Sequence, residues 1–376
     1  MIDTICLLIP KNRILSLDDE SKGFTWDLIS RTNDYDKYVR NPTKLQKESG
    51  LYYPRLTGYK RKYRDERNVK IEFSIPKLLY NNNLDEVSET DFPTVIKLLR
   101  ERLDDMNVKV SEKILATASV SSVHYSKNII LTDGYTVNQV ISEINKIDLT
   151  KVFDFARARF INEGQSLYLH TSSHQFTIYD KLADMQKDKK RAIDKDQTVT
   201  QRTLFNNIEK RGILSEVIRF EVRLNKKVKM DSVFQKLGYE KNQNFEQVFK
   251  EELSTKVLLY YWNELILRRN LAIFTIQTSD TDTLRMIYKF NPNIKPARAI
   301  YLYGLLSLSK STNGMRELRS IFSKKSNART WYRITKDLRE LSNALPATLV
   351  RGWVKQIQTG LENYTPLKTK NYESIK

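Results

Sequence analysis

The 376-residue chain contains little of several residue types that support particular classes of function. Its single cysteine excludes an internal disulfide framework and a zinc site built from cysteines. Its three histidines would all be needed for an all-histidine metal centre. The 11 glycines form neither a phosphate-binding loop nor a dinucleotide fingerprint, so ATP-driven chemistry is not expected.

Long apolar runs are also missing. None reaches the roughly 18 residues that a membrane-spanning helix requires. The opening Met1–Thr4 carries an acid where a secretion signal needs positive charge. With a charged fraction of 29% and a mean hydropathy of −0.54, the composition predicts a soluble, cytoplasmic protein without a membrane partner. The 40% hydrophobic content is enough for a core, and the length favours two domains.

Basic side chains are in large excess. The chain has 64 lysines and arginines against 45 acidic residues, a formal net charge of +19. Residues 295–376 alone hold 16 basic and 5 acidic side chains. Such an excess attracts polyanions because binding releases their counterions, so nucleic acid is the expected partner. The alternative is a basic surface without a specific ligand.

Apolar side chains in the first part of the chain follow strand and helix periods in turn. Residues 69–75 show the clearest strand pattern, because Ile71, Phe73 and Ile75 fall on one face. Helical spacing predicts helices at 95–103 and 137–147. Further strands are expected at 4–9, 51–59, 114–131, 153–160, 166–178 and 217–224, with a turn at 162–164. This order predicts an antiparallel sheet with helices on one face.

The later part of the chain has a helical pattern. Residues 185–200, rich in lysine and aspartate, are expected to form a solvated loop. The predicted fold class is α+β, with a sheet domain at 1–235, a helical connection at 236–290 and a basic, mostly helical domain at 291–376. Within the last two, apolar stripes predict helices at 245–268, 280–288, 297–308, 314–322 and 328–341.

A tyrosine and a lysine lie two residues apart near the end of one predicted strand. If that strand is extended, Thr177, Tyr179 and Lys181 share a face and their apolar neighbours point into the core. A tyrosine that attacks phosphorus forms an ester reactive enough to be reversed, while a cation balances charge on the phosphate. Lys181 is expected either to lower the pKa of Tyr179 or to hold the phosphate. Because the chain has 20 tyrosines, a structural role is the alternative, and Tyr168 is the rival nucleophile.

Carboxylates on the polar sides of predicted strands are the candidate metal ligands. Glu221 alternates with apolar residues, so it is expected to point away from the core, between Arg219 and Arg223. Glu72 has the same relation to its own strand, and His124 ends another strand. Carboxylates with one histidine favour Mg²⁺ or Mn²⁺ over zinc. An Arg–Glu–Arg ladder on the surface is the alternative, and both arginines are candidate DNA contacts.

A basic helix is predicted at 328–341. Arg329, Arg333 and Lys336 share one side at i, i+4 and i+7, and apolar residues occupy the other side. A basic helix after a short turn is what the recognition helix of a helix-turn-helix requires. We therefore predict that these three residues contact duplex DNA, with a solvated amphipathic helix as the alternative.

Several short segments, taken in order, resemble one protein family. The chain is similar to the gene II and gene X replication proteins of filamentous phages and their plasmid relatives, rolling-circle initiators related to the HUH nickases. Each segment is short, and together they span most of the first 225 residues. The segments are 1–3, 69–79, 82–84, 123–128, 178–181 and 218–223.

The resemblance implies a function and roles for several residues. Tyr179 matches the family nucleophile, Lys181 the lysine two places later, and Glu221 lies on the Arg-Phe-Glu strand. Glu72 and His124 fall in family segments, although the chain lacks a His-hydrophobe-His pair. The implied activity nicks one DNA strand at the origin through a 5′-phosphotyrosyl bond, with Mg²⁺ or Mn²⁺, and later religates it. Expected partners are duplex and single-stranded origin DNA and the host helicase and polymerase, and an oligomer is compatible with the sequence.

Two other functions fit the same residues. A DNA-binding replication regulator would use the basic helical domain without catalysis. A nuclease that activates water would use Glu221 and Glu72 with a metal and no tyrosyl intermediate. The sequence does not separate replication from conjugal transfer, which uses the same chemistry.

Overall fold

The computed structural model shows a mixed α+β protein. The predicted turn at 162–164 and most of the predicted loop at 185–200 lie outside the described residues. The structure describes the chain except for residues 18–26, 33, 62–66, 133, 149–156, 162–164, 187–215, 269–270, 277, 324–327, 345–348 and 370–376.

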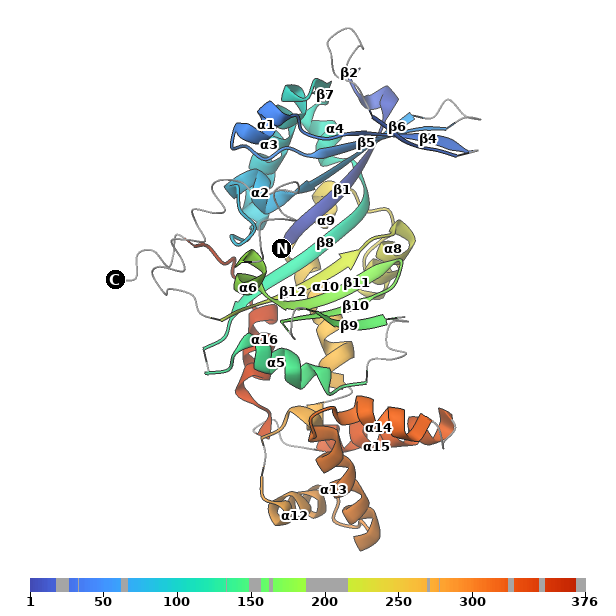
Figure 1. The fold of residues 1–376 in the computed structure, drawn as a ribbon, viewed down its shortest axis with the longest axis vertical. Coiled ribbons are helices and arrows are strands. Elements are labelled where there is room, and N and C mark those ends of the chain that lie inside the picture. The colour runs from blue at the N-terminus through green and yellow to red at the C-terminus, as the bar shows by residue number, and fades with distance from the viewer. Residues whose placement is uncertain are drawn as a thin grey trace, which may run out of the picture.

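One antiparallel sheet organises the described residues (Figure 1). Its ten strands lie in the order β3-β4-β5-β6-β1-β8-β12-β11-β10-β9. A separate pair, β2 (Ser16–Leu17) and β7 (Val108–Lys109), lies outside it. The strands of the large sheet are β1 (Ile2–Pro10), β3 (Asp27–Arg31), β4 (Tyr35–Arg40), β5 (Arg55–Arg61), β6 (Arg67–Ser74), β8 (Ser119–Ile130), β9 (Arg157–Ile161), β10 (Ser166–His170), β11 (His174–Asp180) and β12 (Val217–Leu224).

Helices precede, interrupt and follow the sheet strands. Side-chain caps start several of them; Thr136, for example, forms a capping box with Gln139 at the start of α5. The helices are α1 (Lys44–Glu48), α2 (Ile75–Tyr80), α3 (Phe92–Asp105), α4 (Glu112–Ala116), α5 (Val137–Asn145), α6 (Lys181–Gln186), α8 (Lys227–Lys236), α9 (Phe245–Val248), α10 (Glu251–Trp262), α12 (Asp280–Phe290), α13 (Pro296–Lys310), α14 (Gly314–Ser323), α15 (Ala328–Ala344) and α16 (Gly352–Glu362).

The hydrophobic core lies on one face of the sheet. Phe176 and Phe220 project from adjacent strands and pack against Tyr261 and Trp262 of α10. Buried aromatic side chains of this size make the largest single contributions to a core, about 3–5 kcal/mol each by truncation to alanine. Because side chains alternate along a strand, the residues between these aromatics face the opposite side of the sheet. Tyr179 and Glu221 lie on that opposite side.

Several predicted elements are confirmed with small shifts of their ends, but others are wrong. The stretch 114–131 was expected to be strand throughout, whereas its first residues belong to α4. The helix expected at 245–268 is divided into α9 and α10, and it continues as a π-helix at Asn263–Leu267. Strands β3 and β4 and helices α8 and α16 were not predicted. The two strands and α8 have weak periodicity, and contacts with distant segments stabilise them instead. The sequence of α16 does carry a helical apolar spacing, at Trp353, Val354, Ile357 and Leu361.

The later helices contact the sheet domain at two places. α16 packs against β8 and α10, so the range 291–376 includes a helix that belongs to the core of the sheet. At the other contact, Gly314 begins α14 with a φ of +48°. Its backbone lies so close to Lys146 that an added Cβ would be 2.8 Å from the backbone carbonyl oxygen of Lys146. Nearby, Asp148 accepts hydrogen bonds from Arg319 and from the indole of Trp331.

Membrane insertion is not indicated by any described helix. Among the residues that the structure describes, none of the helices is long and apolar enough to cross a bilayer.

Candidate functional site

The predicted catalytic residues lie on the polar face of the sheet, at neighbouring positions of β11 and β12. Tyr179 is paired with Arg219 across the two strands, and Thr177 is paired with Glu221. The next strand, β8, places Ser126 opposite Glu221. The antiparallel register therefore brings together residues that are about 40 positions apart in the chain.

Tyr179 is in a strand, as predicted, but it is not poised as a tyrosinate. Its side chain is 7% exposed, and its hydroxyl donates a 3.4 Å hydrogen bond to Oε2 of Glu221. Burial raises the pKa of Tyr179 well above 10, and the nearby charge of Arg219 only partly opposes this effect. The expectation that a neighbouring cation lowers the tyrosine pKa is therefore wrong for this state, because desolvation outweighs the attraction.

Lys181 is the first residue of α6 and lies beside Tyr179. Its ammonium is 5.9 Å from the centroid of the tyrosine ring, and the side chain is almost fully buried. Burial, followed by repulsion from Arg219, lowers the pKa of Lys181 to about 7. A substantial fraction of this lysine is consequently uncharged at neutral pH, which is the range suited to proton transfer.

Glu221 points away from the core, as predicted, yet it is only 1% exposed. The alternative of a surface ladder is therefore wrong: the carboxylate is enclosed by neighbouring polar groups. Its Oε1 accepts a 2.8 Å hydrogen bond from Nε of Arg223 and lies 3.8 Å from Nδ1 of His124. Burial raises the pKa of Glu221, but Arg223, with help from Arg219 and His124, holds it below its usual value. Burial also lowers the pKa of His124, so its ring is neutral at neutral pH.

Arg219 joins four segments of the chain and is nearly inaccessible. One terminal nitrogen donates to Oδ1 of Asp3 at 2.7 Å and to Oγ of Ser126 at 2.9 Å. The other donates to Oδ1 of Asn128 and to the carbonyl of Asn83, both at 3.2 Å. Arg219 is thus held inside the site rather than presented to solvent as a DNA contact.

Asp3 is a site residue that the sequence analysis did not single out. A β-bulge between Ile2 and Thr4 changes the alternation of β1 at this point and allows the carboxylate to reach Arg219. Burial raises the pKa of Asp3, but Arg219, Lys181 and His124 lower it far below its ordinary value. The available signal was an acid inside an otherwise apolar strand, a position where only a paired charge is stable.

Glu72 does not join this group. It lies on β6, separated from β12 by β1 and β8, and its carboxylate is 43% exposed and 3.7 Å from the ammonium of Lys70. Tyr168, the rival nucleophile, does share the face, because it pairs with Thr177 on β11. It is half-buried, and burial raises its pKa as well.

The donors around Glu221 do not form a ready metal site. Among the described residues, His124 lies 3.8 Å from Glu221, and Asp3 is held by Arg219. Within the described ranges, no group of three histidine, cysteine, aspartate or glutamate side chains is arranged to hold an ion. Mg²⁺ requires near-octahedral oxygen donors, so the residues as placed do not fit it, and the expectation of Mg²⁺ or Mn²⁺ stays a prediction.

The predicted DNA-binding residues of α15 lie apart from the strand site. Arg329, Arg333 and Lys336 are all exposed, on the side of α15 opposite the buried Leu338. In Figure 1 this helix lies beyond α5, away from β11 and β12. Because residues 324–327 are not described, the turn that a helix-turn-helix requires lies outside the description.

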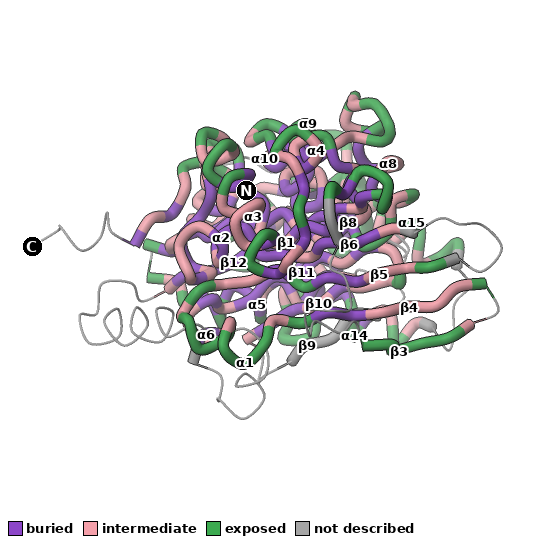
Figure 2. The backbone as a smooth tube through the Cα atoms, turned by 90° about the horizontal axis from the view of Figure 1, so that it is seen from above, coloured by how far each residue is buried: buried purple, intermediate pink, exposed green. Residues whose placement is uncertain are grey.

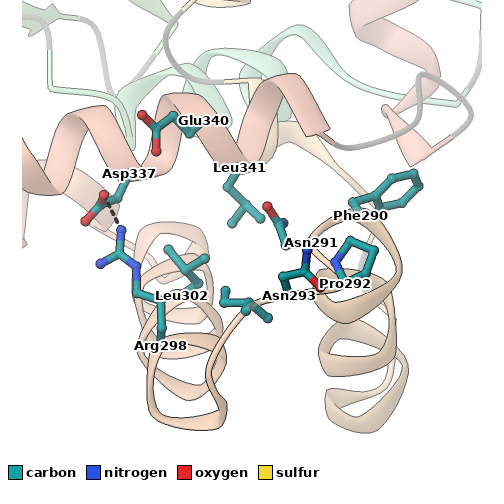
Figure 3. A pocket seen from close by; sticks show the side chains of 10 residues that line it. Phe290, Asn291, Pro292, Asn293, Arg298, Leu302, Asp337, Glu340 and Leu341 are labelled. Atoms are coloured by element: carbon teal, nitrogen blue, oxygen red, sulfur yellow. Dashed lines mark hydrogen bonds and ion pairs between the residues drawn. The ribbon is translucent and has the colours of Figure 1, made fainter.

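A pocket between α12, α13 and α15 contains none of the predicted site residues (Figure 3). Its polar feature is an ion pair between Arg298 of α13 and Asp337 of α15, with apolar Leu302 and Leu341 nearby. The remaining polar side chains of the lining are Asn291, Asn293 and Glu340.

Comparison with known proteins identifies no relative. A scan against protein-family models, a search of curated proteins and a search of solved structures each found no match to this chain. The function is therefore argued from the residues and their geometry.

Proposed function

We propose that this protein initiates rolling-circle DNA replication by nicking one strand of origin DNA through Tyr179 and later religating the displaced strand. The observation that best supports this proposal is the buried group of Tyr179, Lys181, Arg219 and Glu221 on one face of the sheet. It combines a nucleophile, a lysine that titrates near neutrality and a fixed guanidinium. These are the components of phosphoryl transfer to a side chain.

The chemical step balances with the groups present. The Tyr179 oxygen forms a bond to phosphorus while the bond from phosphorus to the 3′ oxygen breaks. Uncharged Lys181 takes the tyrosine proton and delivers it to the departing 3′ oxygen, leaving a 3′-hydroxyl that primes synthesis. The 5′ phosphate stays on the tyrosine, so the reverse reaction reseals the strand. Glu221 orients the tyrosine hydroxyl through its hydrogen bond.

DNA has to gain access to a nearly enclosed hydroxyl. Tyr179 is 7% exposed, so the proposal requires the groups over its hydroxyl to move when DNA binds. A phosphate that enters next to Arg219 would compete with Asp3 as its counter-charge. We assign duplex origin binding to α15, in the cytoplasm together with the host helicase and polymerase.

A covalent adduct tests the proposal. Purified protein is incubated with Mg²⁺ or Mn²⁺ and a supercoiled plasmid carrying its replicon, then digested with protease and analysed by mass spectrometry. We expect a nucleotide on the Tyr179 peptide, lost in Tyr179→Phe and retained in Tyr168→Phe, which serves as the matched control. Nicking without an adduct would indicate a water-activating nuclease, and binding without nicking a non-catalytic regulator.

Metal removal is a separate prediction for the same assay. We expect chelation with EDTA to abolish nicking and Mn²⁺ or Mg²⁺ to restore it, because the resemblance to rolling-circle initiators implies a divalent ion that balances charge on the phosphate. Initial nicking rates measured against metal concentration check this. Full activity of metal-stripped protein would show that no metal ion is needed to balance the phosphate charge beside Arg219.

A further inference from the structure

The sheet extends beyond its helices as a three-stranded wing, defined here as residues 27–31, 35–40 and 55–61 of β3, β4 and β5. Figure 1 shows it projecting from the upper part of the molecule, and Figure 2 shows β3 exposed along its whole length. The three strands carry six basic and two acidic side chains. None of these residues contributes to the strand site described above.

Aromatic and basic side chains alternate on one side of the wing. Tyr35 and Lys37 share a side of β4, and Lys37 is paired with Tyr59 on β5. The rings of Tyr35 and Tyr59 meet edge to face with centroids 5.8 Å apart, and the Lys37 ammonium lies 5.9 Å from the Tyr59 ring. These three side chains are all half-buried and therefore keep accessible surface.

This side of the wing is continuous with the polar face that holds Tyr179. Tyr59 pairs with Asn68 on β6, so it shares a side with Lys70 and Glu72. The face then crosses β1 and β8, where His124 is half-buried, to reach Glu221. From β4 to β11 the path crosses six strand spacings, roughly 30 Å at about 4.8 Å each.

We propose that the wing is a second binding site for single-stranded DNA, in which Tyr35 and Tyr59 stack on bases and Lys37 and Lys70 contact phosphates. Stacking aromatics interleaved with cations are the features that bind single strands without sequence preference. The proposal rests on the proposed function in one respect only, the course of the bound DNA strand. That DNA strand would run along the polar face of the sheet from Tyr179 to the wing. At about 3.4 Å per stacked nucleotide, the path corresponds to roughly nine nucleotides.

Length-dependent binding tests this inference. Fluorescence anisotropy would compare oligothymidylates of roughly 6 and 30 nucleotides, since only the longer one spans both sites. We expect Tyr35→Ala/Tyr59→Ala to weaken binding of the longer oligonucleotide about tenfold or more, so that most of its advantage over the shorter one is lost. Tyr35→Phe/Tyr59→Phe should keep wild-type affinity, because phenylalanine also stacks. Lys37→Ala should reduce the salt slope by about 0.7.

Tyr38→Ala is the matched control, since Tyr38 lies on the same strand but on the opposite side. Circular dichroism shows that each variant is folded, and Lys37→Glu serves if the alanine double variant unfolds. Wild-type affinity in folded Tyr35→Ala/Tyr59→Ala, or equal weakening by Tyr38→Ala, would overturn the proposal. The proposal would also be overturned if Tyr35→Ala/Tyr59→Ala changed the sedimentation coefficient of the protein but not its affinity for DNA. That result would show that the β3 edge pairs with a second copy of the chain. Length-dependent binding without a Tyr179 adduct would reject the nickase and leave the wing intact.

Discussion

The strand site groups four buried side chains, those of Tyr179, Lys181, Arg219 and Glu221, with half-buried Asp3. Arg219 is paired with Asp3, and Arg223 with Glu221, whereas Lys181 has no ion pair within 4 Å among the described residues. Burying a charge without a close partner costs several kcal/mol, so the lysine responds by losing its proton more readily. Its pKa of about 7 is therefore a direct consequence of its position.

Lys181→Met should make the free energy of unfolding less dependent on pH between about 7 and 9. In the wild type, folded Lys181 loses its proton near pH 7, while the unfolded chain keeps it to about pH 10.4. Unfolding therefore takes up a proton, and stability rises with pH by up to about 1.4 kcal/mol per unit from this group. Urea unfolding at several pH values measures the slope.

The matched control for this experiment is Lys97→Met, which replaces an exposed lysine of α3. It is expected to keep the wild-type slope. An unchanged slope in Lys181→Met would mean that Lys181 stays charged in the folded protein, and it would remove the proton-transfer role proposed for this residue.

At the scale of elements, α15 is the helix proposed to contact duplex DNA. Its exposed side carries Arg329 and Arg333, while Trp331 on the other side is bonded to Asp148 of the sheet domain. This anchoring gives the helix a fixed position relative to β11 and β12. A basic helix held in this way can set where the duplex lies with respect to the nicking site.

Arg329→Glu/Arg333→Glu should weaken binding of origin duplex and lower the magnitude of its salt slope by about 2, because two phosphate contacts are lost. Lys44→Glu/Lys47→Glu on α1 makes the same change in net charge at exposed positions remote from α15 and is the matched control. Filter binding over a salt series measures both. Equal loss in the two variants would indicate a general effect of charge, and no loss would remove α15 from the DNA interface.

At the scale of the whole molecule, Glu86 joins the central strand β8 to the segment that follows α16. It accepts hydrogen bonds from the Lys127 ammonium and the Asn128 amide of β8, both at 2.6 Å. It also accepts one at 2.9 Å from the amide of Leu367, in the segment after α16. Burial raises the pKa of Glu86, but Lys127 holds it below the usual value. The stability from this carboxylate is thus present at neutral pH and is lost as acid protonates it.

Glu86→Leu should destabilise the protein by about 3–5 kcal/mol, because Lys127 would be left buried and unpaired. Glu86→Leu/Lys127→Met should cost clearly less than the sum of the two single variants, since neither charge then remains. Urea unfolding at pH 7 gives the four values of the cycle. Additive losses would show that the pair does not act as a unit.

The sequence by itself determined the features that depend on neighbouring residues. Strand alternation predicted that Tyr179 and Glu221 point away from the core, and helical spacing predicted the exposed arginines of α15. These predictions are confirmed because a side chain's direction follows from the period of its own element. The excess of basic charge likewise follows from the composition of the sequence alone.

Only the tertiary structure decided which of these residues are buried and what they contact. Glu221 was expected to point away from the core, and pairing of its strand with β8 and β11 encloses its side chain. Asp3 joins the site because a bulge shifts β1, and Glu72 stays outside because two strands intervene. The weakly patterned β3 and β4 form by pairing with each other, and β4 pairs in turn with β5. Burial and pKa depend on contacts between distant segments, which a local pattern does not encode.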